Sequence, residues 1–170
     1  YWNPLFITSC FPNTLSFNTG TPFNSFNRAP QIRLTHTAKD VTFIVAAVTQ
    51  RDYTSYGPVG ASYTYLSNAV YPNLHGQVHY SLQDSATKTS LLFGFGGESK
   101  LLVPRLVNEN NEKVNETVNG MSVIAFVKLT TEAFTWKINA RYGENNTDIM
   151  APSGFALRDS SDGKTFTYTP

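Results

Sequence analysis

The three histidines are the first candidates for chemistry, because together they could hold a metal ion. His75 and His79 are four residues apart, a spacing that would place both on one face of a helix. The alternation of apolar and polar residues through 78–82 instead predicts a strand, in which the two side chains lie about 13 Å apart. His36 belongs to a different segment. The sequence therefore predicts three separate surface or strand-edge histidines, with no metal site and no cofactor.

Groups for acid–base or nucleophilic catalysis form no recognisable pattern either. Glu109, Glu112 and Glu116 lie in polar sequence, the opposite of the apolar pocket that raises the pKa of a general acid. Cys10, the single cysteine, has aromatic neighbours and is typical of a small buried hydrophobe. Residues 94–97 (GFGG) lack the Lys-Ser/Thr pair and the helix of a phosphate-binding loop, and indicate a bulge or a sharp strand exit. We therefore expect a protein that is not an enzyme.

Two loop-like segments carry side chains suited to binding, one after the apolar run 41–48 and one after the alternating segment 134–142. The expected ligand-binding residues are Arg51, Asp52, Tyr53, Tyr56, Tyr142, Asn145 and Asn146. Aromatic rings pack on the C–H faces of neutral sugars, and planar Asn, Asp and Arg groups bind their hydroxyls. Tyrosine also offers a large contact area at a small entropy cost. The alternative is that Tyr53 and Tyr56 only cap one end of the sandwich.

Short β-strands are the elements expected to carry these loops. Period-two alternation is typical of a strand with one buried face, and a continuous apolar run such as 41–48 is typical of a strand buried on both sides or at the centre of a sheet. Further strand signals lie at 32–35, 63–65, 78–82, 91–95 and 101–107. Pro104 moves the last of these towards a sheet edge.

The clearest signal is a β-hairpin. Residues 121–129 and 134–142 both read as strong strands, and Thr130-Thr131-Glu132 separates them. In the second strand the apolar residues alternate with polar ones, so we expect Trp136 and Ile138 to be core residues whose truncation is costly.

The strand count predicts the fold class. About nine short strands, including closing strands near 155–157 and 166–168 divided by a turn at 159–163, indicate an all-β antiparallel sandwich or barrel. Galectin-like and jelly-roll-like topologies both fit this count. Residues 109–118 predict either a short helix or a solvated loop. Residues 1–30, rich in Pro and Phe, predict an irregular arm packed on the sandwich, so that residues 1–170 form a single domain.

Composition narrows the partners and the setting. The net charge of +1 disfavours nucleic acid, and no stretch reaches the ~20 apolar residues of a membrane helix. The chain opens with Tyr1, without Met or a signal-like segment, which indicates a piece of a longer protein. Sequons at Asn115 and Asn145 support an extracellular or virion-surface setting.

Two resemblances point to viral attachment proteins. Residues 134–136 (FTW), the polar loop 145–147, the step 148–153 and the final aromatic strand 165–168 resemble the C-terminal half of the adenovirus fibre head. The Tyr1-Trp2 pair and the hairpin strand 134–139 resemble the rotavirus spike head, a galectin-like glycan-binding domain. Galectin's sugar-binding signatures do not occur in order, so this resemblance implies a class of protein and no particular site residues.

Three functions follow as hypotheses. The first is a receptor- or glycan-binding head on a virion or cell surface, with a host cell-surface glycan or glycoprotein as partner and a homo-oligomer formed through the parent protein. The second is a structural or oligomerisation module, such as a capsid protrusion or an adhesin subunit. The third is a hydrolase whose site would be a deep cleft with two facing carboxylates.

Overall fold

The computed structural model describes residue 10, residues 27–159 and residues 166–169. The arm expected over residues 1–30 and the turn expected at 159–163 therefore lie largely outside the described residues. Cys10 is buried, as its aromatic neighbours indicate, and packs against Phe126.

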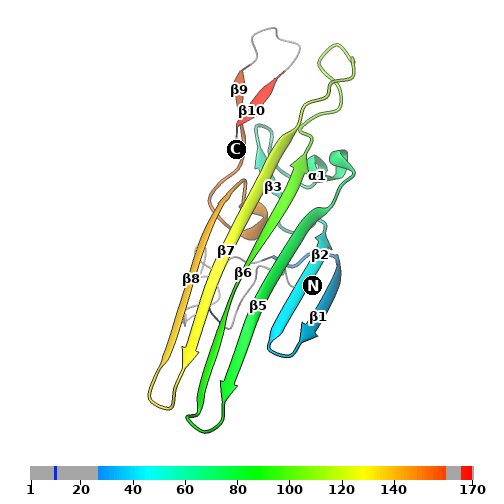
Figure 1. Cartoon of the computed structure of the whole chain (residues 1–170). Coiled ribbons are helices and arrows are strands. Elements are labelled where there is room, and N and C mark those ends of the chain that lie inside the picture. The colour runs from blue at the N-terminus through cyan, green and yellow to red at the C-terminus, as the bar shows by residue number, and fades with distance from the viewer. Residues whose placement is uncertain (1–9, 11–26, 160–165, 170) are drawn as a thin grey trace.

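A six-stranded antiparallel sheet dominates the fold (Figure 1). Its strands, in spatial order, are β1 (Gln31–Ala38), β2 (Val41–Val48), β5 (Asn73–Asp84), β6 (Thr89–Leu102), β7 (Val118–Thr130) and β8 (Thr135–Glu144). The six strands follow one another across the sheet in chain order, and two longer segments leave it: β3, β4 and α1 lie between β2 and β5, and residues 103–117 lie between β6 and β7. The expected hairpin is confirmed, because Val123 pairs with Tyr142 and Leu129 with Trp136.

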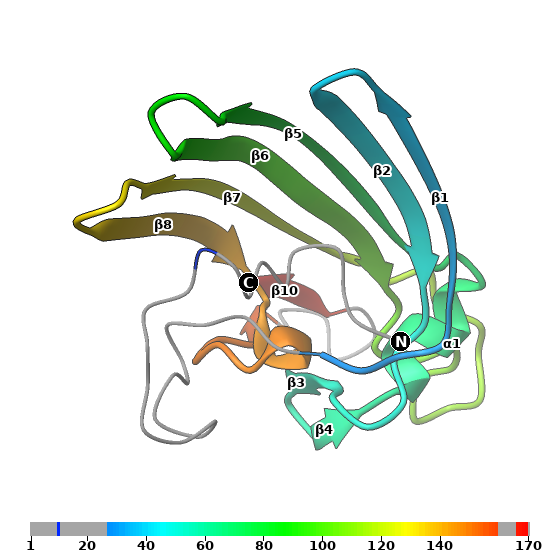
Figure 2. The same cartoon turned by 90° about the horizontal axis from the view of Figure 1, so that it is seen from below.

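Smaller elements gather beneath one face of this sheet, which we call the inner face (Figure 2). They are β3 (Ser55–Gly57) with β4 (Gly60–Ser62), helix α1 (Thr64–Ala69), the 3-10 turn η3 (Thr147–Ile149), and β9 (Ala156–Asp159) with β10 (Thr167–Thr169). The fold is all-β, antiparallel and sandwich-like, as the strand count predicts, with ten strands in the described residues.

The apolar core lies between the inner face and these smaller elements. Leu102 of β6 and Val118 of β7 meet Tyr65 of α1 and Phe155, and all four are buried. The rings of Tyr65 and Phe155 meet edge to face, with centroids 5.1 Å apart. Tyr168 of β10 packs on the same cluster, so the end of the chain closes the core.

The opposite, outer face of the sheet is apolar and exposed, which overturns one expectation. Trp136 and Ile138 alternate on β8 as expected, but they point outward and keep 64% and 59% of their surface. Inward-pointing positions of this strand are polar instead, for example Asn139 and Arg141. The alternation is therefore correct, and the choice of buried face is wrong.

Three further expectations need correction. Residues 63–65 belong to the start of α1 and not to a strand, because Tyr65, Leu66 and Ala69 are the buried side of a single helical turn. Residues 94–97 lie inside β6, which runs without a break from the expected strand 91–95 to Leu102. The strand 41–48 pairs on both edges, yet Phe43 and Val45 are exposed on the outer face. Residues 109–118 form a loop, except that Val118 begins β7.

Candidate functional site

The first expected binding loop joins β2 to β3 and is closed by a pair of hydrogen bonds. Gln50 Nε2 donates to Ser55 Oγ, and Ser55 N donates to Gln50 Oε1, each over 3.0 Å. Both residues are buried, so the loop between them is held at its base. Arg51 and Asp52 are exposed and Tyr53 is half-buried.

The second expected loop is placed differently from the prediction. Tyr142 lies on the outer face of β8, and Asn145 and Asn146 are buried, with Asn145 fully enclosed. The two asparagines therefore do not form an exposed recognition loop. Of the two sequon asparagines, Asn145 is fully buried and Asn115 is exposed.

Two members of the expected set are nevertheless brought to one place, through Ser153. Phe155 N donates to Tyr56 O over 2.9 Å, which fixes the segment after Ser153 against β3. Asn146 N donates to Ser153 Oγ, so the same segment is also tied to η3. A Cβ at Gly154 would come within 2.7 Å of Tyr56 O, so this close crossing requires glycine.

Two hollows meet at Ser153, and we call them together the Ser153 groove. One, of about 720 Å³, is open and lined by Tyr56, Pro58, Phe155 and Leu157. The other, of about 360 Å³, is polar and lined by Asn139, Arg141, Asn146 and Ser153. Asn146 Oδ1 is buried there without a hydrogen-bond partner among the described residues. Aromatic, amide, guanidinium and hydroxyl groups therefore lie side by side.

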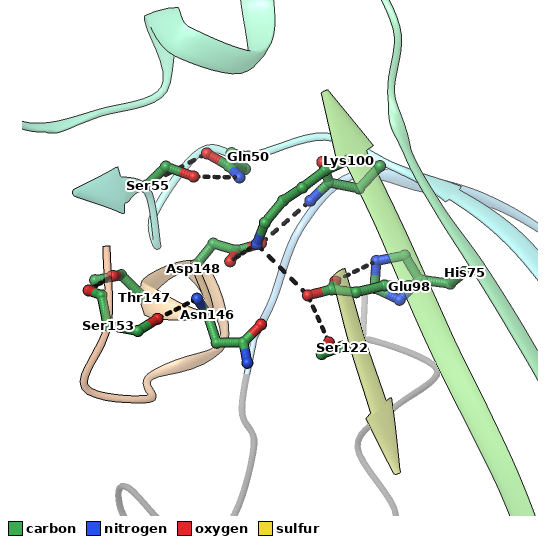
Figure 3. Close-up of polar contacts among 11 residues, drawn as sticks. Gln50, Ser55, His75, Glu98, Lys100, Ser122, Asn146, Thr147, Asp148 and Ser153 are labelled. Carbon is green, nitrogen blue, oxygen red and sulfur yellow. Dashed lines mark hydrogen bonds and ion pairs between the residues drawn. The ribbon is translucent and has the colours of Figure 1, made fainter. Parts of the chain in front are cut away.

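Behind this groove lies a set of buried charged side chains, which we call the buried-charge cluster (Figure 3). Its members are His75, Glu98, Lys100 and Asp148, assisted by Asn73 and Ser122. Lys100 Nζ forms an ion pair with Asp148 Oδ1 and lies 3.5 Å from Glu98 Oε1. His75 Nε2 lies 3.1 Å from Glu98 Oε2, and Ser122 Oγ donates to Glu98 Oε1 over 2.9 Å.

Sheet register explains how these residues meet. His75 of β5 and Ser122 of β7 are the cross-strand partners of Glu98 on β6, so all three side chains point to the inner face at one level. Lys100 follows two residues later on the same face of β6. Asp148 comes from η3 and is held by Asn73 Nδ2, which donates to its Oδ2 over 3.1 Å. The cluster therefore ties η3 to three strands.

Burial and charge act in opposite directions on the pKa values of this cluster. Burial alone would raise the pKa of Glu98, but Lys100 and the contacts from His75 and Ser122 outweigh it and lower this pKa to about 2. Burial and the charge of Glu98 raise the pKa of Asp148, against the pull of Lys100. The two carboxylates raise the pKa of Lys100 despite its own burial, so it carries the balancing positive charge.

The cluster corrects two sequence-level predictions. His75 is fully buried and is not a surface histidine. Glu98 and Asp148 flank one lysine in the interior, an acid pair that the sequence did not reveal. The side chains of both acids have no exposed surface, so no substrate reaches them in this conformation. The cluster holds η3 against the sheet through Asp148. It thereby positions Asn146, which forms part of one wall of the Ser153 groove.

A second polar contact set holds the end of the chain. Arg105 Nε and Nη2 donate to the two oxygens of Glu116 over 2.8 and 2.7 Å, and Tyr168 Oη donates to Glu116 Oε2 over 2.9 Å. Arg105 also stacks 3.7 Å above the ring of Phe166. Hydrogen bonds from Arg105 lower the pKa of Glu116, while burial and then Glu116 raise the pKa of Tyr168 to about 12. Glu116 is thus buried and paired, not part of a solvated acidic loop.

Comparison with known proteins adds no relative. No family model, no curated protein and no solved structure matches this chain. Among residues 27–159 and the other described positions, no group of three or more His, Cys, Asp or Glu side chains is placed to hold a metal ion. No helix in the described part is long and apolar enough to cross a membrane.

Proposed function

We propose that this chain is a structural module, which builds a larger protein assembly by burying the outer face of its main sheet. The observation that carries this proposal is the exposure of a continuous apolar surface over all six strands. Its large exposed side chains are Ile32, Leu34, Phe43, Val45, Leu74, Leu82, Phe93, Phe95, Met121, Val123, Val127, Trp136, Ile138 and Tyr142.

The size of this surface sets it apart from ordinary surface hydrophobes. Strands of eight to fourteen residues, spaced about 4.8 Å apart and rising about 3.4 Å per residue, give the outer face an area on the order of 1,000 Å². Soluble monomers rarely leave apolar patches larger than a few hundred Å² in water. Water contact with such a face is unfavourable by about 25 cal/mol per Å², which favours any arrangement that covers it.

Charge placement supports the same proposal. On the outer face of the described strands, the ionisable groups other than tyrosine lie at the margins: Asp84 and Glu144 at strand ends, and His36 on the edge strand β1. A depletion of charge from the centre and a polar rim are typical of protein–protein interfaces. This is the structural or oligomerisation module among the three hypotheses, of which a capsid protrusion or an adhesin subunit is an example.

The test compares two exposed apolar residues. Ile138→Lys places a charge on the outer face, and Val59→Lys places one on the β3–β4 turn, away from that face. Both side chains are exposed, so both variants are expected to fold. Association, followed by light scattering over a range of concentrations, should be lost in Ile138→Lys and kept in Val59→Lys. Identical behaviour of the two variants would remove the basis of the proposal.

The Ser153 groove favours a second candidate function, a receptor- or glycan-binding head such as a viral attachment protein carries. Its open hollow carries the ring of Tyr56, and the polar hollow that joins it at Ser153 carries Asn139 and Arg141, so a ring and planar polar groups of the kinds that bind sugars line one groove. Arg51, Asp52 and Tyr53 lie on the loop before β3, which carries Tyr56. In this candidate function the protein is extracellular or on a virion surface, and its ligand is a host cell-surface glycan or glycoprotein.

A glycan-array screen tests this second candidate. Tyr56→Ala is expected to abolish binding of any glycan that the wild-type chain retains, because it removes the exposed aromatic wall of the groove. Tyr63→Ala is the matched control, since Tyr63 is equally exposed but lies next to α1 and does not line the groove. Equal binding by the two folded variants would place the ligand elsewhere, and an empty array would argue against glycan recognition.

A further inference from the structure

We infer that the partner covering the outer face is a second copy of this chain, which packs face to face to form a two-fold symmetric dimer. This inference rests on the proposed assembly function and specifies its partner. The resulting particle would be a layered structure in which two six-stranded sheets meet at about 10 Å, the usual spacing of packed sheets.

Shape at the centre of the face supports a self-complementary contact. Phe95, on the central strand β6, projects outward with 66% of its surface exposed. Its ring forms one wall of a shallow apolar hollow of about 300 Å³, whose other lining residues include Val78, Tyr80, Phe93, Ala125 and Val127. The residue of β7 that pairs with Phe95 is the small Ala125, which also lines the hollow.

Symmetry turns this feature into an argument for a second copy. In a two-fold interface both chains use the same patch. If one residue of the first chain contacts a second residue of its partner, the same contact occurs with the two chains exchanged. A projecting ring and a hollow that lie next to each other on one patch satisfy this condition, since Phe95 of each copy can enter the hollow of the other. A two-fold contact also closes, so the middle of the outer face is not free to add a further copy.

The area of the face agrees with this partner. The three middle strands β5, β6 and β7 have twelve to fourteen residues each and offer on the order of 600 Å² per chain. The adjoining parts of β2 and β8 bring the contact towards the ~800 Å² per partner of a standard stable interface. The sheet bends away at its margins (Figure 2), so contact is centred on the middle strands β5, β6 and β7. On the outer face, Asp84 lies at the end of β5, Glu144 at the end of β8 and His36 on the edge strand β1. No like charges therefore need to be buried against each other at the middle of the contact.

The experiment measures mass in solution for the whole 170-residue chain. Sedimentation equilibrium or light scattering over a wide concentration range gives the stoichiometry of the wild type, of Phe95→Lys and of the control Val59→Lys. We expect twice the chain mass for the wild type and for Val59→Lys. We expect Phe95→Lys to weaken association at least about 30-fold, the effect of losing a central interface residue. Circular dichroism checks that each variant is folded, and Val123→Lys, on the outer face of the middle strand β7, replaces Phe95→Lys if the latter is not.

The outcomes separate the second copy from the broader proposal. A wild-type chain that stays monomeric at high concentration overturns the dimer. Species larger than two, lost in Phe95→Lys but kept in Val59→Lys, overturn the closed dimer while they support assembly through the outer face. Association that is equal in all three proteins overturns both. A dimer that only Phe95→Lys dissociates supports both.

Discussion

At the scale of single residues, Lys100 has the most demanding position in the described structure. Its ammonium group is fully buried between Glu98 and Asp148, with His75 on the far side of Glu98. Moving charges out of water costs several kcal/mol each, and their mutual attraction offsets that cost only when every partner is in place. The intact cluster therefore contributes little net stability to the fold, but removing one member should lower the free energy of unfolding strongly, because it leaves a buried charge without its partner.

The first prediction follows from this asymmetry. Lys100→Met leaves two buried carboxylates without their shared cation, and should lower the free energy of unfolding by about 3–5 kcal/mol. Lys88→Met is the matched control, because Lys88 pairs with Glu132 over 2.8 Å at the surface, where both side chains are mostly exposed. That change should cost less than about 1 kcal/mol. Urea denaturation of both variants measures the difference, and similar losses would contradict the buried pairing.

The second prediction concerns acid stability and Glu98. Its folded-state pKa of about 2 lies below the usual 4.5, so its ionised form stabilises the fold at neutral pH. This contribution is present above pH 4.5 and is lost as the pH falls towards 2. The lowered pKa of Glu116 acts in the same direction, whereas the raised pKa of Asp148 acts in the opposite one.

Substitution isolates the contribution of Glu98. Its direct partners are His75, Lys100 and Ser122, and Asp148 and Arg141 interact with it by charge. Glu98→Gln should be less stable than the wild type at pH 7 by on the order of 3 kcal/mol. That gap should narrow steadily in urea titrations at pH 5, 4 and 3. A gap that stays constant over this range would show that Glu98 titrates normally in the folded chain.

At the scale of elements, alternation along the strands is predictable from the sequence but the buried face is not. In β7 the outer positions include Met121, Val123 and Val127, and the inner ones include Ile124 and Phe126, so both sides are apolar. In β8 the apolar side is the outer one. Which face is covered depends on where α1, η3 and the β9–β10 pair pack, and that is a property of the tertiary structure.

The third prediction compares two aromatic residues on neighbouring strands. Trp136→Ala on β8 should cost less than about 1 kcal/mol of unfolding free energy, because the ring is mostly in water in the single chain. Phe126→Ala on β7 should cost about 3–5 kcal/mol, because that ring is buried against Cys10. Denaturation at the lowest usable protein concentration measures both without a contribution from association. A larger loss of unfolding free energy in Trp136→Ala than in Phe126→Ala would indicate that Trp136 is a core residue.

The candidate site was only partly predictable for a similar reason. Tyr56 could be chosen from residue type and loop position, and it does line a groove. His75 and Glu98 are more than twenty residues apart in the chain. They meet only because the turn at 85–88 sets the register of β5 against β6. Asn145 and Asn146 look like a polar surface loop, but Asp148 anchors the turn that follows them and draws the segment inside. α1 is missed because six residues are too few for a helical period.

At the scale of the whole molecule, the two faces of the main sheet differ in exposure to water. The inner face is covered and holds both the apolar core and the buried charges, while the outer face carries apolar side chains into water. A chain folded in this way is stable as a single copy only through its inner half. If the outer face is covered by a second copy, folding and association become linked, and stability depends on protein concentration.

That linkage gives the last prediction, with a readout independent of mass. A dimer that unfolds to separate chains gains stability as concentration rises, so the melting temperature of the wild type should increase by about 3–5 °C for each hundredfold rise in concentration. Phe95→Lys should melt at one temperature throughout, because its outer face is no longer buried, and Val59→Lys should keep the wild-type slope. Differential scanning fluorimetry over two decades of concentration is sufficient. A wild-type melting temperature that does not move would mean that the outer face stays in water, and that the inner half alone accounts for the stability of the fold.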